Sequence, residues 1–186
     1  SSSKAAADLA TQSWISSFDA NNVAIARAGN VVGGGDWGID RLIPDLVSSF
    51  SNGTPAKIRY PEAIRPWQHV LDCLAGYISL SEKMLSGGVS GAWNFGPEFA
   101  VENTVARVAD LAAKNWGGSA GWERDLDPNP HEAGYLLLDS TKARAELRWH
   151  DQLDFSSTIE WTIEFYKAAY QGSSSRDLLE NQVSRY

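Results

Sequence analysis

The chain has 186 residues, of which 43% are hydrophobic and 21% charged, the composition of a globular protein with one domain, or one and a half. Its formal net charge of −7 argues against a nucleic-acid surface or a basic membrane patch. No apolar run approaches the roughly 20 residues of a membrane span, and Cys73 is the single cysteine. We therefore expect no membrane partner and a reducing compartment, the cytoplasm.

The first part of the chain is expected to combine helices with a buried strand. Apolar residues at helical spacing predict a helix over 1–18, and a nearly continuous apolar run predicts a parallel strand over 23–28. A glycine-rich loop is expected at 29–38. Asp40 is expected to cap the next helix, which ends near Phe50.

The rest of the chain continues this alternation. Strands are expected at 56–60, 92–95 and 121–124, and helices at 70–85, 102–116, 139–147 and 156–170. The helix at 70–85 is expected to turn one apolar stripe towards the core, formed by Leu71, Leu74, Ile78 and Leu85. The polar segment from residue 172 is expected to be a mobile tail.

Strands that alternate with helices indicate an α/β chain with a parallel sheet. Only the strands at 23–28 and 92–95 have the composition of sheet-core strands, and two strands cannot form a free-standing doubly wound sheet. The chain also begins without methionine and inside a predicted helix. It is therefore expected to be a fragment, with the remaining strands upstream of Ser1.

The stretch from Arg27 to Asp72 is the predicted ligand site. It contains five basic and five acidic residues, and a neutral stretch in an acidic protein suits a small anionic ligand better than a polyanion. Its triple glycine, 33–35, allows a ligand to approach the backbone closely, although a flexible turn is the alternative. Arg65, kept extended by Pro66, is expected to reach into a cleft and grip a phosphate, with a surface ion pair as the alternative.

A metal site is not predicted. His69 and His131 could act as ligands in principle, but no cluster of cysteines or carboxylates supports that role. Cys73 lies in an apolar helical pattern and is expected to be a buried small hydrophobe.

Six motifs resemble those of a known family, namely RAGNVVGGGDW, DRLIPD, AIRPWQHVLD, AWNFGP, NPHEAGYLLLD and STKARAELRWH. From Ser1 to about Tyr170 the chain is similar to the C-terminal part of the extended short-chain dehydrogenases/reductases that act on nucleotide sugars. The resemblance implies an α/β fold, namely the C-terminal part of a Rossmann-type enzyme with its smaller mixed α/β substrate-binding domain.

The same resemblance implies domain boundaries. Residues 1–30 and 67–97 would be the remnant of the NAD-binding Rossmann domain. Residues 31–66 and 98–171 would form the nucleotide-sugar substrate domain, and 172–186 a polar tail.

The run GNVVGGGDW, followed by DRLIPD and IRPWQHV, is most similar to the dehydratases that act on CDP-sugars. The resemblance implies NAD-dependent oxidation of the sugar at its fourth carbon, loss of water from the fifth and sixth, and return of hydride to the sixth. Such products lead to deoxysugars of bacterial surface polysaccharide, including O-antigen. Another epimerase or dehydratase of the same fold, or a non-catalytic interaction fragment, is the alternative.

By position, Lys4 would be the catalytic lysine of the family's Tyr-x-x-x-Lys pair and would also contact the nicotinamide ribose of NAD. Ala28 would lie near the nicotinamide. The tyrosine of the pair, the glycine-rich NAD fingerprint and the acid/base pair for elimination are not in this chain, which is therefore expected to be inactive alone. The resemblance also implies a homodimer through the N-terminal helix.

The resemblance further assigns substrate-binding residues. Asn30 and Arg65 would hold the diphosphate of a nucleotide sugar, and His131 would lie near the phosphates or the ribose. The nucleotide pocket would be lined by Arg41, Leu42 and Ile43, with Ile58 and Tyr60 as neighbours of the cytosine.

Overall fold

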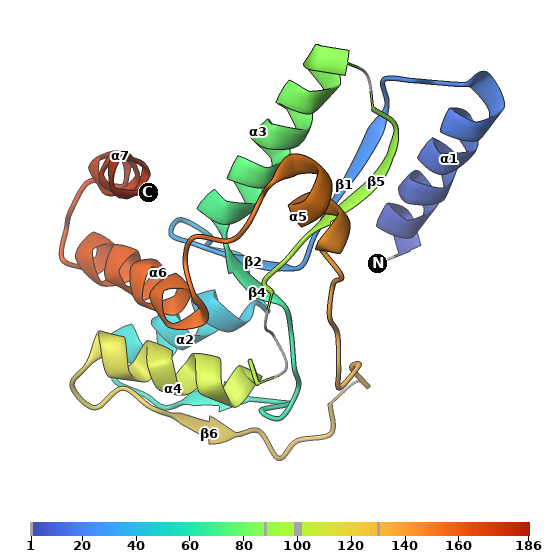
Figure 1. Cartoon of the computed structure of the whole chain (residues 1–186). Helices are drawn as coiled ribbons and strands as arrows, with labels where there is room; N and C mark the ends of the chain where they lie inside the picture. The colour runs from blue at the N-terminus through green and yellow to red at the C-terminus, as the bar shows by residue number, and fades with distance from the viewer. Residues whose placement is uncertain (1, 88, 99–101, 130) are drawn as a thin grey trace.

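The computed structural model describes residues 2–87, 89–98, 102–129 and 131–186 (Figure 1). Its helices are α1 (Ser2–Phe18), α2 (Leu42–Ser51), α3 (Val70–Gly87), α4 (Val105–Trp116), α5 (Thr141–Leu147), α6 (Phe155–Tyr170) and α7 (Ser175–Arg185). Its strands are β1 (Ala24–Ala28), β2 (Asn30–Val32), β3 (Ala56–Ile58), β4 (Trp67–His69), β5 (Gly91–Phe95) and β6 (Trp122–Arg124). Each helix and strand expected from the sequence is present, with bounds that differ by only a few residues.

The strands of the described residues form parallel pairs: β1 with β5, β2 with β4, and β3 with β6. β1 and β5 run side by side from the pair Ala24–Gly91 to the pair Ala28–Phe95 (Figure 1). The connection from β1 to its partner contains the helix α3, because two parallel neighbours cannot be joined by a tight hairpin. The predicted α/β class with parallel strands is confirmed.

Two apolar clusters form the core of the described residues. The larger lies where α2, α4 and α6 meet β3, and among its most deeply buried members are Leu46, Val108, Ile159 and Phe165. The smaller lies between α3, α5 and β5, and its buried members are Leu80, Trp93, Phe95, Ala143 and Trp149. The domain boundaries implied by the family resemblance stay a prediction.

The apolar stripe of α3 does not face the core, so that prediction is wrong. Leu74, Ile78 and Leu85 are 47%, 60% and 87% exposed. The helix instead buries Asp72, Cys73, Gly76 and Leu80. A small residue is needed on this face, because a Cβ at Gly76 would lie 2.4 Å from Cδ1 of Phe95. Cys73 is buried, as predicted. Because α3 carries apolar residues on two faces, periodicity alone could not choose between them.

The segment before α2 also differs from the prediction. The expected loop at 29–38 begins with strand β2, which pairs with β4. Asp40 does not cap the helix, because its backbone is left-handed with a φ of 59° and the N-cap position belongs to Arg41, which makes no side-chain cap hydrogen bond. Pro44 lies in the first turn, where its missing N–H removes no helical hydrogen bond.

The C-terminal segment is a helix, α7, where a mobile tail was expected. Ser174 caps it by accepting a hydrogen bond from the N–H of Asp177. The buried Gln182 donates a hydrogen bond of 2.7 Å to the carbonyl of Trp161, and the hydroxyl of Tyr186 donates one of 2.9 Å to the Oδ1 of Asp72. The helix is thus held largely by polar contacts, which a search for apolar periodicity does not detect.

Candidate functional site

A cavity of about 430 Å³ lies between β2, the start of α2 and β3. It is lined by seven of the eight substrate-binding residues predicted from the sequence, which are Asn30, Arg41, Leu42, Ile43, Ile58, Tyr60 and Arg65. The eighth, His131, is exposed and does not line the cavity, but its neighbour Glu132 does. The roles assigned to these residues stay predictions, but their common location is a property of the fold.

The pairing of β2 with β4 brings together Asn30 and Arg65, the two residues predicted to bind the diphosphate. Asn30 lies opposite Trp67, two residues after Arg65. The N–H of Asn30 donates a hydrogen bond of 3.1 Å to the carbonyl of Pro66, which fixes the start of β2 against the chain that carries Arg65. The two side chains therefore reach the same cavity from neighbouring segments.

The glycine loop forms one edge of the cavity and is held by close packing. A Cβ at Gly34 would lie only 2.0 Å from Cγ of Phe165, so the loop backbone rests directly on α6. The hydroxyl of Tyr166 donates a hydrogen bond of 2.6 Å to the carbonyl of Asp36, and burial raises the pKa of Tyr166 to about 12. The ring of Trp37 packs edge-on against Tyr166, with 5.1 Å between the centroids. This loop is therefore a fixed wall of the cavity.

At the mouth of the cavity, Arg41 is paired with Asp36. Its Nη1 lies 2.7 Å from the Oδ2 of Asp36, and both side chains are well exposed. Burial acts to raise the pKa of Asp36, but the hydrogen bonds from the Gly38 N–H and the Arg41 guanidinium outweigh it, so the pKa is lowered. Asp36 is therefore ionised at neutral pH and holds Arg41 over the start of α2.

The strand β3 supplies an apolar wall. Ile58 is 3% exposed and packs into the core beneath the cavity. Beyond it, the hydroxyl of Tyr60 donates a hydrogen bond of 3.2 Å to the carbonyl of Asn129, which fixes the ring at the cavity edge. A planar base could pack against this combination of an aliphatic and an aromatic side chain.

Arg65 lies deeper than the other cavity arginines, with its side chain 12% exposed. Its Nη1 donates a hydrogen bond of 2.9 Å to the carbonyl of Ile64, and its Nη2 lies 3.5 Å from the Oε2 of Glu132. The other oxygen of Glu132, Oε1, lies 3.6 Å from Nη2 of Arg59. Arg65 thus faces the cavity and also belongs to an ion pair, and its role as a phosphate ligand stays a prediction.

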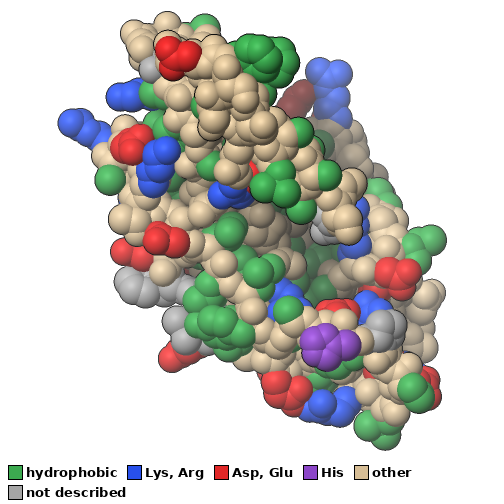
Figure 2. Space-filling view, turned by 90° about the vertical axis from the view of Figure 1, so that its right-hand side faces the viewer, with side chains coloured by type: hydrophobic (Ala, Val, Ile, Leu, Met, Phe, Trp, Pro, Cys, Tyr) green, Lys and Arg blue, Asp and Glu red, His purple; other side chains and the backbone are tan. Residues whose placement is uncertain are grey.

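Charges of both signs surround the cavity, and Figure 2 shows basic and acidic side chains next to one another around a hollow in the face that it draws. Among the described lining residues, the basic side chains are Arg41, Lys57, Arg59 and Arg65, and the acidic ones are Asp36, Asp40, Asp45 and Glu132. The site is therefore electrically balanced when empty, in agreement with the neutral stretch seen in the sequence. Arg59 lies within the predicted ligand stretch but was given no individual role, and Glu132 was not predicted at all. The only signal for Glu132 is its position next to His131.

Neither Lys4, on α1, nor Ala28, the last residue of β1, lines this cavity. Arg27 makes a two-pronged ion pair with Asp8 of α1, at 2.6 Å and 2.9 Å, and this contact lowers the pKa of Asp8 to about 2. Lys4 is exposed one helical turn, about 6 Å, before Asp8. The ion pair thus holds α1 against β1, with the turn that carries Lys4 next to the contact.

A metal cluster of three or more histidine, cysteine or carboxylate side chains is absent from the described residues. His69 is fully buried in β4, and burial lowers its pKa to about 4, so it is neutral at physiological pH. The described part of the chain also has no helix with the length and apolar character needed to cross a membrane.

Residues 1–96 match the model of the NAD dependent epimerase/dehydratase family. The chain belongs to this family. Over its whole length it is 39% identical to the CDP-glucose 4,6-dehydratase of Salmonella typhimurium, of which it covers 55%. It is 29% identical to the dTDP-glucose 4,6-dehydratase of Haemophilus influenzae, over 94% of this chain and 53% of that protein. The chain spans about half the length of the curated relatives it matches.

A solved structure shares the fold of this chain. The dTDP-glucose 4,6-dehydratase from Bacillus anthracis, in complex with NAD, resembles the chain with a TM-score of 0.75 at 21% identity, over 91% of this chain and 52% of that one. The likeness supports the Rossmann-type fold predicted from the motifs.

Proposed function

We propose that the protein to which this chain belongs is an NAD-dependent CDP-glucose 4,6-dehydratase, a hydro-lyase, and that this chain provides its nucleotide-sugar pocket. One observation carries the proposal: residues that the dehydratase motifs mark as substrate-binding come from separate segments and line one cavity. The identity of 39% to a CDP-glucose 4,6-dehydratase over the whole chain supports the same assignment. A cavity of about 430 Å³ is within the range of small-molecule sites.

Each residue of the cavity would contact a different part of the substrate. Arg65 offers a planar fork of donors that suits a diphosphate, and Asn30 offers an amide from the neighbouring strand. Ile58 and Tyr60 would pack against the cytosine, and the start of α2 would close over the nucleotide through Arg41. His131 would reach the phosphates or the ribose only from outside the cavity, next to Glu132. The sugar would then point away from the base.

NAD, when bound, would take hydride from the fourth carbon of the glucose and return it to the sixth after water has been lost. Lys4 is the residue of this chain whose position fits a role beside that cofactor, because it is exposed on α1 near the ion pair that joins α1 to β1. Its ammonium charge would favour the ionised form of a neighbouring phenol and would hold a ribose hydroxyl. Ala28, at the end of β1, has a small side chain that would let a flat ring come close to the strand.

Nucleotide preference tests the proposal directly. The full-length protein is expected to bind CDP about tenfold more tightly than UDP or dTDP, since contacts with the wrong base cost on the order of 1–3 kcal/mol. Isothermal titration with the three diphosphates measures the difference. Equal or reversed preference would contradict the cytidine assignment and favour another nucleotide-sugar enzyme of the family.

We also propose that the enzyme is a cytoplasmic homodimer that associates through α1. Trp14 and Phe18 stand one turn apart on this helix, are 56% and 65% exposed, and pack against each other with ring centroids 4.4 Å apart. An exposed aromatic pair on a helix face is typical of a contact surface. The buried, unpaired Cys73 agrees with a reducing compartment.

Trp14→Glu tests the dimer. It places a charge in the proposed interface and is expected to shift the protein towards the monomer, raising the dimer dissociation constant by about a hundredfold. Sedimentation equilibrium measures this constant, and Ser16→Glu, an exposed change on the other side of α1, serves as the control. A Trp14→Glu protein that dimerises like the parent would mean that α1 is not the interface.

A further inference from the structure

The carboxylate of Glu132 stands between two arginines at the wall of the cavity. Its Oε2 lies 3.5 Å from Nη2 of Arg65, and its Oε1 lies 3.6 Å from Nη2 of Arg59. All three residues line the cavity. Each oxygen of the carboxylate is thus directed to a different arginine, and the carboxylate occupies the position between them.

The backbone fixes this arrangement. The N–H of Ile64 donates a hydrogen bond of 2.9 Å to the carbonyl of Gly134, and the N–H of Leu136 donates one of 3.1 Å to the carbonyl of Ile64. These two bonds tie the segment that carries Glu132 to the residue immediately before Arg65. The meeting of Glu132 with Arg65 therefore results from the chain path and not from a chance contact of two long side chains.

The contacts themselves are loose. Charge-assisted hydrogen bonds between nitrogen and oxygen are usually about 2.7–2.9 Å long, whereas both distances here exceed 3.4 Å, and the side chain of Glu132 is 42% exposed. A partly solvated ion pair of this kind contributes little stability and is readily exchanged for a stronger anion. A diphosphate that binds Arg65 would also come close to the charge of Glu132 and be repelled by it.

We propose that Glu132 is an internal counter-ion of the phosphate subsite, which neutralises Arg59 and Arg65 in the empty cavity and competes with the phosphates of the incoming nucleotide. The proposal rests on the proposed function in that Arg65 is taken to hold the diphosphate. An anion then binds only if the free energy of its own contacts, including those of the base, exceeds the cost of displacing the Glu132 carboxylate from the two arginines. Glu132 is in this sense a specificity residue for ligands that combine phosphate with a nucleoside.

Glu132→Gln tests the proposal, because it removes the charge and keeps the shape. Isothermal titration of the full-length protein is carried out with CDP, with inorganic pyrophosphate and with uncharged cytidine. The variant is expected to bind CDP and pyrophosphate about three- to tenfold more tightly than the parent and cytidine equally well. Glu132→Ala should likewise bind CDP and pyrophosphate more tightly than the parent and cytidine equally well. Glu62→Gln is the matched control, because Glu62 pairs with Arg124 outside the cavity.

Three results would overturn the inference. If Glu132→Gln binds CDP more weakly, the carboxylate orients the arginines and does not compete. If cytidine gains as much as CDP, the effect is not electrostatic. If neither phosphate ligand gains, Glu132 has no influence on the subsite. Failure of the proposed function has a different signature, namely no preference for CDP over UDP and dTDP. Tighter pyrophosphate binding by the variant would support the counter-ion role even then.

Discussion

Replacing Arg65 by alanine is expected to weaken the binding of CDP-glucose about 10- to 100-fold. The guanidinium lies in the cavity with only 12% of its side chain exposed, where water screens its charge poorly. Hydrogen bonds to charged groups contribute about 1.5–3 kcal/mol, and about 1.4 kcal/mol corresponds to a factor of ten in the dissociation constant. Arg65→Lys should restore only part of the affinity, because a point charge does not replace a planar fork of donors.

Isothermal titration of CDP-glucose with the two variants measures this effect. Arg124→Ala is the matched control, because Arg124 forms its ion pair with Glu62 away from the cavity, and its loss should leave affinity within about twofold of the parent. Parent-like binding by Arg65→Ala would mean that Arg65 serves only its ion pair with Glu132. A loss of thermal stability in parallel with the loss of binding would point to a folding role instead.

The sequence was sufficient to predict the fold class and most of the cavity. The strand at 23–28 was recognisable because a buried parallel strand is a continuous apolar run, and Asn30 follows it at the end where such folds bind ligands. Arg41 and Arg65 belong to two of the motifs, Ile58 was assigned by its position in the resemblance, and the structure places all three at the same cavity. The two motifs lie in separate segments of the chain, and the fold brings their residues to one site.

The features that could not be predicted from the sequence depend on contacts between segments that are distant in the chain. Glu132 meets Arg65 only because backbone hydrogen bonds join residues 64 and 134, and no local pattern encodes that pairing. The prediction placed the wrong face of α3 against the core. The face that is in fact buried contains small residues such as Gly76, which contribute little to apolar periodicity. The helix α7 was missed because polar contacts of Gln182 and Tyr186 hold it in place.

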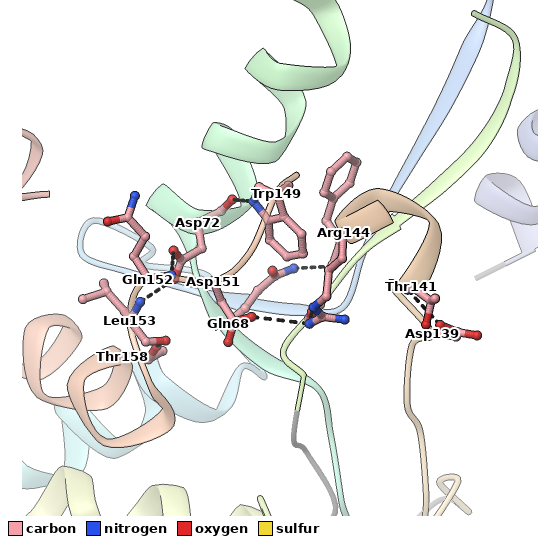
Figure 3. A network of polar contacts seen from close by, with 12 residues as sticks. Gln68, Asp72, Asp139, Thr141, Arg144, Trp149, Asp151, Gln152, Leu153 and Thr158 are labelled. Carbon is pink, nitrogen blue, oxygen red and sulfur yellow. Dashed lines mark hydrogen bonds and ion pairs between the residues drawn. The ribbon is translucent and has the colours of Figure 1, made fainter. Parts of the chain in front are cut away.

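Asp72 is a buried polar residue on which the stability of the fold should depend strongly. It is fully buried in α3, and Figure 3 shows its carboxylate directed towards the chain at Gln152 and Leu153. It accepts hydrogen bonds from the N–H groups of Gln152 at 2.7 Å and Leu153 at 3.4 Å and from the hydroxyl of Tyr186 at 2.9 Å. The backbone carbonyl of Asp72 also accepts a hydrogen bond of 3.0 Å from the indole of Trp149 (Figure 3). One side chain thus joins α3 to the segment before α6 and to the last residue of the chain, which follows α7.

Asp72→Ala is expected to lower the free energy of unfolding by about 2–4 kcal/mol. It leaves three donors without their acceptor, and an unsatisfied buried group costs about 1–3 kcal/mol. The cost should be less than the full sum, because the hydroxyl of Tyr186 can turn towards water. Urea unfolding followed by circular dichroism measures the change, and Asp127→Ala, in an exposed turn, is the control and should stay within about 0.5 kcal/mol of the parent.

Asp72→Asn separates the hydrogen bonds from the charge. Burial raises the pKa of Asp72 more than its hydrogen bonds lower it, so the ionised form is disfavoured in the folded protein. Its contribution to stability is therefore fully present below the pKa of the unfolded chain and is lost as the pH rises through the higher folded value. An amide keeps one acceptor and has no such titration, so Asp72→Asn should cost about 1 kcal/mol or less at neutral pH. If Asp72→Asn destabilises as much as Asp72→Ala, the ionised carboxylate itself, and not the acceptor geometry, holds the three segments together.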